Sequence, residues 1–182
     1  IEMADLNPCV VDVDVFVMES VFEDSYLQEE KSIALVDIGA NKLNVNIVKD
    51  NVSAFTRDVA IGGEEITREI ANQFGLPFEE AEKTKLGQAS DKVSPQQLHD
   101  IVTSYVSNWC SEIRRVMDFY YSTYPDESIE RILLSGGASQ TSGFLEQLAT
   151  ETSARVEMFD PFRALEIDDK EHDKDYLKRV AP

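Results

Sequence analysis

Ile33-Ala-Leu-Val-Asp-Ile-Gly-Ala-Asn-Lys-Leu-Asn-Val-Asn-Ile-Val48 is the stretch that decides the fold of this chain. An apolar run ends in an acid, Asp37, a glycine follows, and apolar residues then alternate with asparagines. The pattern predicts a buried strand over residues 33–38, a tight turn from Gly39 to Lys42, and a second strand with one apolar and one polar face. Such a turn can wrap a phosphate with its backbone N–H groups, and a carboxylate beside it can hold a metal ion through water. By itself, the stretch is equally consistent with a simple hairpin.

Turn and cap signals divide the rest of the chain into strands and helices. Apolar residues alternate with polar ones where we expect strands, and they recur at three- and four-residue spacing where we expect helices. Residues 28–32 should form a solvated linker, and Ser142 should cap the helix that follows it. We expect strands at 9–13, 33–38, 43–47, 54–61, 129–134 and 155–158, and helices at 13–26, 63–74, 78–86, 95–124, 143–152 and 175–180.

The strongest helical signal begins at Ser94-Pro95, a typical helix start. Apolar residues follow at spacings of three and four up to Tyr120. We therefore assign the aromatic stripe of this helix, Tyr105, Trp109 and Tyr120, to the core rather than to a cofactor site. In the first helix, Phe16, Val17 and Val21 should face inward.

The composition is that of a soluble globular protein with an acidic surface. The formal net charge is -18, and 42% of the residues are hydrophobic. Nucleic acid and anionic membrane surfaces would repel this charge, whereas a basic protein partner would not. The simpler reading is an acidic surface that only keeps the protein soluble. No apolar run approaches the length of a membrane span, and no signal peptide is recognisable.

The two cysteines, Cys9 and Cys110, are expected to be ordinary buried thiols of a reducing compartment. His99 and His172 stand alone, so a zinc site is not expected. The chain begins at Ile1 inside an apparent strand rather than at a methionine, and it stops soon after an amphipathic stretch. We therefore expect it to be a fragment of a longer protein.

Two further glycine turns follow expected strands. Ser135-Gly-Gly137 lies between a buried strand and a helix, where glycine lets a flat ligand approach the backbone closely. Gly62-Gly63 joins a meander of three strands to a helix. The chain contains no P-loop, and without the G-x-G-x-x-G spacing a Rossmann dinucleotide site is not expected. Each turn alone is a weak signal.

The order of these turns is more specific than any one of them. The chain has, in order, a strand with D-x-G, a strand that leads through two glycines into a helix, a lysine-bearing helix, a long helix and a strand with S-G-G. This order resembles the second half of the actin/Hsp70/FtsA ATPase fold. Among proteins with this fold, the sequence motifs are most similar to those of the PilM family of type IV pilus assembly proteins. The cell-division protein FtsA has the same loops and is the nearest alternative. The resemblance rests on residues 10–14, 34–40, 55–57, 62–66, 75–81, 134–138 and 160–162.

The resemblance implies an α/β fold, namely the second half of the actin-like (ribonuclease H-like) ATPase fold, with a mixed sheet, flanking helices and a small helical subdomain. Residues 1–62 and 129–182 would form the subdomain with the phosphate and adenosine loops. Residues 63–128 would form the helical subdomain that covers the nucleotide, with the long connecting helix. The N-terminal half, with the first phosphate loop, would be missing. The fragment should then bind ATP weakly without hydrolysing it, and Asp37 should face open solvent.

The family's nucleotide site carries over onto nine residues. Asp37 would face a nucleotide-bound Mg²⁺, through water, and no residue stands out as a catalytic base. The other eight would contact ATP: Gly39, Ala40 and Asn41 at the phosphates, Gly63 at the border of the base pocket, Glu82 and Lys85 on the ribose and base side, and Gly136 and Gly137 against the adenosine.

Simpler readings stand beside some of these roles. Glu82 and Lys85 share one helix face, but they would fit a plain solvated face as well. Asn41 would also fit an ordinary turn. We interpret Asn44 and Asn46 as exposed strand residues without a role in the site.

The resemblance implies an actin-like nucleotide-binding component on the cytoplasmic side of the type IV pilus assembly platform, which couples ATP binding to protein–protein contacts. Its partner would be the N-terminal tail of the inner-membrane protein PilN, with pilus motor ATPases as further partners. The protein would be cytoplasmic and peripheral to the inner membrane, with no membrane insertion of its own. The full-length protein would be a slow ATPase or only a binder. The alternatives are a nucleotide-independent scaffold and an FtsA-like cell-division protein.

Overall fold

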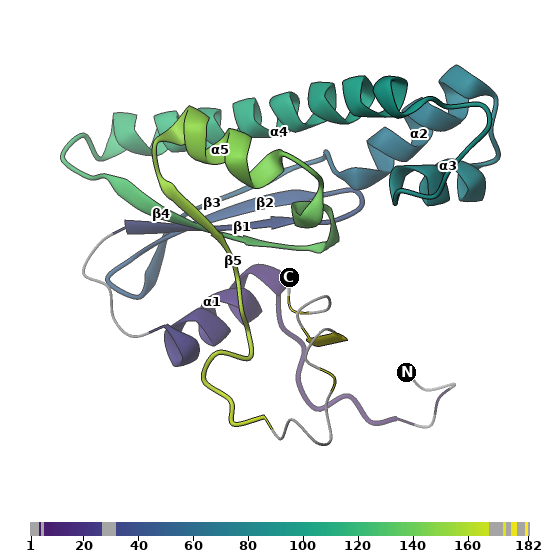
Figure 1. Cartoon of the computed structure of the whole chain (residues 1–182). Coiled ribbons are helices and arrows are strands. Elements are labelled where there is room, and N and C mark those ends of the chain that lie inside the picture. Colours follow the sequence, from purple (N-terminus) through teal and green to yellow (C-terminus); the bar gives the residue numbers. More distant parts are fainter. Residues whose placement is uncertain are drawn as a thin grey trace.

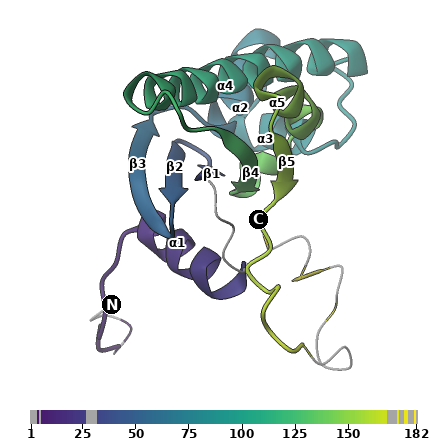
Figure 2. The same ribbon diagram turned by 90° about the vertical axis from the view of Figure 1, so that its left-hand side faces the viewer.

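The computed structural model describes residues 4, 6–26, 32–167, 173, 176–177 and 181. A five-stranded sheet lies at the centre, with α4 and α5 on one face and α1 on the other (Figures 1 and 2). The short helices α2 and α3 lie beyond one end of the sheet, near the start of α4 (Figure 1). The elements are α1 Asp14–Ser25, β1 Ser32–Ile38, β2 Leu43–Lys49, β3 Val52–Val59, α2 Gly63–Phe74, α3 Phe78–Lys85, α4 Pro95–Thr123, β4 Ile129–Ser135, the 3₁₀ helix η2 Gly137–Gln140, α5 Phe144–Thr152 and β5 Arg155–Met158.

The sheet is mixed and has the strand order β3-β2-β1-β4-β5. β1, β2 and β3 form an antiparallel meander, whereas β1 pairs with β4 and β4 with β5 in parallel. Parallel strands need long crossover connections, and the helices between β3 and β4 and between β4 and β5 supply them. Asp37 lies opposite Ser135 in the register, so the D-x-G and S-G-G turns leave neighbouring strands side by side. The expected mixed α/β sheet with flanking helices is confirmed.

The main core lies between the sheet and helices α4 and α5. Trp109 and Tyr120 of α4 are fully buried, and the Trp109 ring meets Phe144 of α5 edge-on, with 5.5 Å between ring centroids. The start of α4 has the expected cap: the Gln97 N–H donates to Ser94 Oγ, and the Ser94 N–H donates to the Gln97 side chain. The aromatic stripe of this helix therefore belongs to the core, as expected.

The polar face of β2 is buried, contrary to expectation. Asn44 and Asn46 are only 4% and 1% exposed, because α1 and the neighbouring strand β3 surround them. The Asn46 amide donates to Glu19 of α1 over 3.2 Å, and the Asn44 amide donates to Asp58 of β3. Burial of these amides is tolerated because each has a hydrogen-bond partner. Our interpretation of both as exposed strand residues was wrong.

The expected strand at residues 9–13 is also absent. The segment is irregular, and Val10 and Val11 are 83% and 92% exposed. Within the described part of the chain, no strand pairs with it, and an isolated extended segment has no backbone partners to hold it in a ladder. Cys9 lies in this segment and is exposed rather than buried, whereas Cys110 is buried as expected.

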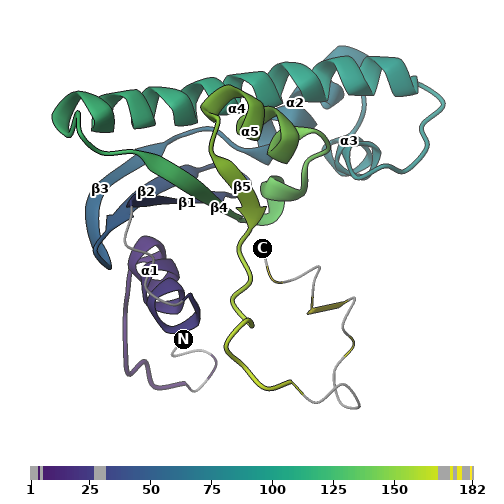
Figure 3. The ribbon, with the colours of Figure 1, turned by 60° about the vertical axis from the view of Figure 1, so that its left-hand side comes forward.

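Helix α1 packs on the sheet only partly through the expected face: Val21 is half-buried against the cluster that contains Phe22, but Phe16 and Val17 do not face inward. Phe16 and Val17 are about half exposed, whereas Val15 and Phe22 are buried. The segment after β5 decides this orientation, because it returns to the side of the sheet on which α1 lies (Figure 3). Tyr26, which ends α1, stacks on Phe159 of that segment with 5.4 Å between ring centroids.

Glycines end the two helices that lie next to the candidate site. Gly75 follows α2 with a φ of 61°, in the left-handed region that a helix C-cap favours. Gly87 follows α3 with a φ of 90°.

Buried residues of α2, α4 and the sheet belong to one continuous core. The division into subdomains 1–62 with 129–182 and 63–128 stays a prediction.

Several remaining expectations concern the ends of elements. Gly143, with a φ of 81°, rather than Ser142 precedes the first turn of α5. The expected linker 28–32 lies outside the described residues, except for Ser32, which is buried and begins β1. The expected helix 175–180 lies outside them too, apart from two residues.

The described residues contain neither a membrane-spanning helix nor a cluster of metal ligands. None of the helices in this part of the chain has the length and apolar character that crossing a membrane requires. The same residues contain no group of three or more His, Cys, Asp or Glu side chains that could hold a metal ion.

Candidate functional site

A pocket of about 860 Å³ brings together predicted site residues from four separate parts of the chain. It lies where the β1–β2 turn, the start of α2, helix α3, the start of α4 and η2 meet. Its volume is within the range of about 300–1,000 Å³ that is usual for small-molecule sites. The predicted residues that line it are Gly39, Ala40, Gly63, Glu82, Lys85 and Gly137.

The β1–β2 turn and the start of α2 hold each other in place. The Gly39 N–H donates to the Lys42 carbonyl over 2.9 Å and closes the turn. The carbonyls of Gly39 and Ala40 then accept the N–H groups of Gly63 and Glu64, which satisfies two of the free donors at the start of α2. A Cβ atom on Gly62 would lie 2.5 Å from the Ala40 carbonyl oxygen. The Gly62-Gly63 pair thus lets the turn pack directly on the helix start.

The turn leaves backbone donors available for a ligand. Within the described part of the chain, the N–H groups of Ala40 and Asn41 form no hydrogen bond to another residue. Ala40 lines the pocket, whereas Asn41 is exposed and does not. Successive free N–H groups in a tight turn are a favourable arrangement for an anion.

Glu82 and Lys85 form an ordered pair at the wall of the pocket. Lys85 Nζ lies 2.7 Å from Glu82 Oε2 and donates to the Gly63 carbonyl over 3.1 Å. Glu82 also accepts a hydrogen bond from Thr67 of α2. The Lys85 side chain is only 17% exposed, which disfavours the reading of a plain solvated face. Lys83, two residues away, does not line the pocket.

The Glu82 carboxyl is held in its ionised form. Partial burial acts to raise its pKa, but the hydrogen bonds from Lys85 and Thr67 outweigh burial, so its pKa lies below the ordinary value. The pocket wall therefore presents a fixed carboxylate and a fixed ammonium group side by side. Such a pair can accept from ribose hydroxyls and donate to a ring nitrogen or a phosphate oxygen.

The two glycines of the S-G-G turn have different physical reasons to be glycine. Gly136 has a φ of 85° and a ψ of 152°, and a Cβ on it would overlap the Ile38 carbonyl and lie 2.5 Å from Asp37 Oδ1. Gly136 does not line the pocket; it lets β4 and β1 end side by side. A Cβ atom added to Gly137 would meet no atom within 4 Å beyond its chain neighbours. The space beside Gly137 is open and belongs to the pocket.

Asp37 lies next to the pocket rather than in it. It lines a second hollow of about 500 Å³ between α1, the carboxyl ends of β1 and β4, and the start of β2. Burial raises the pKa of its carboxyl, the negative charge of Asp14 raises it further, and Lys42 acts in the opposite direction. Asp37 is therefore partly buried beneath α1, and our expectation that it faces open solvent was wrong. The reason is α1 itself, whose packing on this face could not be foreseen from the local pattern.

Helix α4 supplies a pocket wall that the sequence did not indicate. Pro95, Leu98, His99 and Val102 of its first turns line the pocket, with Leu86 at the end of α3. Leu98 and Val102 fit the apolar stripe of α4, so their pattern was indistinguishable from that of core residues. The wall is largely apolar, which suits the flat face of an aromatic ring.

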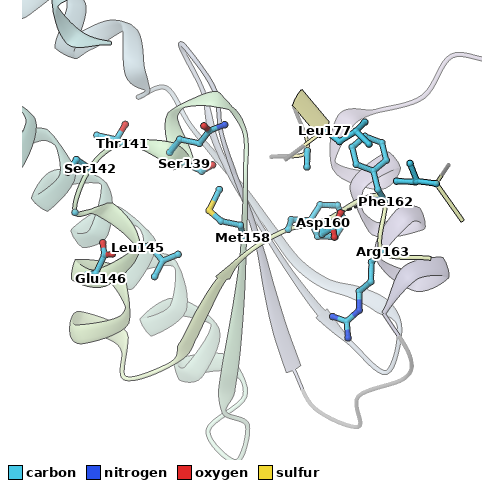
Figure 4. A pocket seen from close by; sticks show the side chains of 15 residues that line it. Ser139, Thr141, Ser142, Leu145, Glu146, Met158, Asp160, Phe162, Arg163 and Leu177 are labelled. Atoms are coloured by element: carbon cyan, nitrogen blue, oxygen red, sulfur yellow. Dashed lines mark hydrogen bonds between the residues drawn. The ribbon is translucent and has the colours of Figure 1, made fainter. Parts of the chain in front are cut away.

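A neighbouring pocket of about 900 Å³ contains none of the predicted site residues. It shares Gln140, Thr141 and Ser142 with the candidate site and extends between α5 and the segment after β5 (Figure 4). Leu145 and Met158 lie on one side of it and Phe162 on the other (Figure 4). The pocket of about 860 Å³ is the better candidate for a functional site, because fixed charges, free N–H groups and an apolar wall converge there.

Comparison with known proteins agrees with the fold and with the family. The family model for "Type IV pilus assembly protein PilM" matches residues 1–182. A chain of a PilM–PilN type IV pilus biogenesis complex is 23% identical, with a TM-score of 0.85 over 100% of this chain and 51% of that chain.

More distant structures have the same fold. MreB 5 of Spiroplasma citri bound to AMPPNP is 10% identical, with a TM-score of 0.60 over 78% of this chain and 52% of that chain. An archaeal actin homologue in complex with ADP is 15% identical, with a TM-score of 0.60 over 82% of this chain and 52% of that chain. This chain spans about half the length of these chains, and it has the expected actin-like fold.

Proposed function

Because the chain belongs to the PilM family of type IV pilus assembly proteins, we propose that the pocket between the β1–β2 turn, α3 and α4 binds ATP or ADP in the full-length protein. Nucleotide binding would then control contacts with other components on the cytoplasmic side of the pilus assembly platform. The protein would be cytoplasmic and peripheral to the inner membrane through its partners.

The convergence of six predicted residues on one pocket carries this proposal. The turn at Gly39 and Ala40 offers N–H groups to phosphates. Glu82 and Lys85 offer fixed charges to the ribose and base, and the open space at Gly137 admits a flat ring. Two solved structures with this fold, MreB 5 of Spiroplasma citri and an archaeal actin homologue, hold AMPPNP and ADP, which supports a nucleotide of this class.

The proposal includes a Mg²⁺ ion that Asp37 would hold through water. The Asp37 carboxylate lies beside the turn, and its raised pKa reflects burial and the nearby Asp14 charge. A divalent cation bound with the nucleotide would stabilise the ionised carboxylate in this setting. We assign no catalytic base, so nucleotide would act as a conformational ligand more than as fuel, with slow hydrolysis at most.

The N-terminal tail of PilN is the proposed partner, since the matching solved complex contains PilM and PilN. Pilus motor ATPases are further proposed partners. If nucleotide and tail bind to different conformations with different affinity, each must change the affinity of the other by the same factor.

Isothermal titration of ATP–Mg²⁺ and ADP–Mg²⁺ into the full-length protein tests the nucleotide site. Replacement Lys85→Met removes the charge at the pocket wall and should weaken binding about tenfold or more, since a hydrogen bond to a charged group contributes about 1.5–3 kcal/mol. Lys83→Met is the matched control, because this lysine lies on the same helix but outside the pocket, and it should leave the affinity unchanged.

The same titrations decide between a nucleotide-binding protein and a scaffold. A nucleotide-independent scaffold would give no heat with either nucleotide up to millimolar concentration, and it would bind a PilN tail peptide equally well with and without ATP. The proposed function requires nucleotide binding by the wild type and a tail affinity that changes when ATP is present.

A further inference from the structure

Lys42 has no role in the site as described so far, although it closes the phosphate-binding turn. Its carbonyl accepts the Gly39 N–H over 2.9 Å, so its backbone position is fixed relative to the free N–H groups of Ala40 and Asn41. Its side chain carries a positive charge next to the turn and is 41% exposed. Lys42 does not line the pocket of Gly39 and Ala40 in this structure, but its long, partly exposed side chain has room to turn towards a ligand at the turn.

Among the described residues, the Lys42 ammonium group is held by one short contact, which it makes with α1. Lys42 Nζ lies 2.6 Å from Asp14 Oδ2, and the Asp14 side chain is 56% exposed. Ion pairs between groups this exposed contribute little to stability, because water and salt screen them. An anion that offers two or three oxygens could replace one carboxylate at the ammonium group without a large loss elsewhere.

The surroundings of the turn otherwise disfavour an anion. The negative charges of Asp14, Asp37 and Asp58 all act on Lys42, and the whole chain has a net charge of -18. A phosphate placed at the turn would meet these carboxylates. Lys42 is the charged group at the turn that offsets them, while Lys85 lies on a different element of the site.

We propose that Lys42 is a phosphate-binding residue of the nucleotide site, and that Asp14 holds its ammonium group beside the turn until the anion binds. This inference rests on the proposed function and adds a residue to it. Asp14 lies in the first turn of α1, so transfer of Lys42 from Asp14 to phosphate would remove the ion pair between that helix turn and the β1–β2 turn. Glu19, one turn further along α1, would keep its bonds to Asn46 and to the Ser53 N–H.

Calorimetric titration of the full-length protein with ATP–Mg²⁺ and with adenosine tests the inference. Lys42→Met should weaken ATP binding about tenfold, because a charge-assisted bond to phosphate is lost, and should leave adenosine binding unchanged. Asp14→Asn removes the competing carboxylate and should strengthen ATP binding about threefold. The control is Lys49→Met, at the other end of β2, where the lysine pairs with Glu127; both affinities should stay at the wild-type values.

The outcomes separate this inference from the proposed function. If the wild type binds ATP and Lys42→Met binds it equally well, Lys42 is not a phosphate ligand although the nucleotide site stands. An equal loss of ATP and adenosine affinity in Lys42→Met indicates a disturbed turn, which also overturns the inference. If the wild type binds neither ligand, both proposals fail. Should Lys42→Met not fold, Asp14→Asn decides, since an unchanged or weakened ATP affinity there contradicts the competition with Asp14.

Discussion

Replacement of Gly136 by alanine should destabilise the protein strongly, whereas the same change at Gly137 should not. Gly136 has a φ of 85° and a ψ of 152°, a region that is essentially restricted to glycine, and a side chain there costs about 1–3 kcal/mol. The added Cβ would also overlap the Ile38 carbonyl and lie 2.5 Å from Asp37 Oδ1. Backbone shifts that relieve such overlap cost about 1–3 kcal/mol more.

Strain and overlap together predict that Gly136→Ala lowers the free energy of unfolding by about 2–6 kcal/mol. This is a large part of the total free energy of unfolding of a typical protein, which is roughly 5–15 kcal/mol. Gly137→Ala meets no atom within 4 Å, and its free energy of unfolding should stay within about 0.5 kcal/mol of the wild type. The added methyl group would instead occupy space in the pocket proposed to bind nucleotide, so ATP binding should weaken while stability is retained.

Urea unfolding followed by far-UV circular dichroism measures both free energies, and calorimetry measures ATP binding by the folded variants. The contrast between adjacent glycines is the decisive feature, because composition and position in the chain are nearly matched. A loss below about 1 kcal/mol in Gly136→Ala would refute the reasoning about strain and overlap. An equal loss of stability in both variants would show that the S-G-G turn acts as one structural unit.

Two further predictions concern titratable groups. The pKa of the Glu82 carboxyl is below its ordinary value of about 4.3, so its ionised form stabilises the fold above that pH and this contribution is lost as pH falls through the lower folded-state pKa. The difference in free energy of unfolding between wild type and Lys85→Met should therefore shrink on acidification. Urea unfolding measures this difference at each pH, and a difference that grows in acid would contradict the prediction. Burial raises the pKa of the Cys110 thiol to about 12 and Cys9 is exposed, so alkylation at pH 8 mapped by mass spectrometry should modify Cys9 and spare Cys110 until the protein is unfolded; modification of both thiols at equal rates would disprove the burial of Cys110.

Much of the fold could be predicted because its signals are local. The apolar run before Asp37 predicted β1, the Ser94-Pro95 start predicted α4, and Gly75 predicted the end of α2. In each case the backbone conformation of a few residues, or the spacing of apolar side chains along one element, carries the information. The order of the glycine turns then indicated the family.

The lining of the candidate pocket was predicted in part for the same reason. Gly39, Gly63 and Gly137 were found through their turns, and the resemblance added Glu82 and Lys85. The α4 wall was missed, because Leu98 and Val102 follow a core pattern and nothing local distinguishes a pocket-facing position from a core-facing one.

Local sequence determined most of the strands, helices and turns, apart from the strand wrongly predicted at residues 9–13, and it indicated which glycines the turns need. Only the tertiary structure decided what lies against each face. Helix α1 covers the sheet, so Asn44 and Asn46 are buried and Asp37 is partly shielded. Packing between segments far apart in the chain also brings Lys42 to Asp14, a contact that neither segment encodes alone. The physical reason is that periodicity reports which face of an element is apolar, whereas burial and ion pairing depend on the partner that the fold places there.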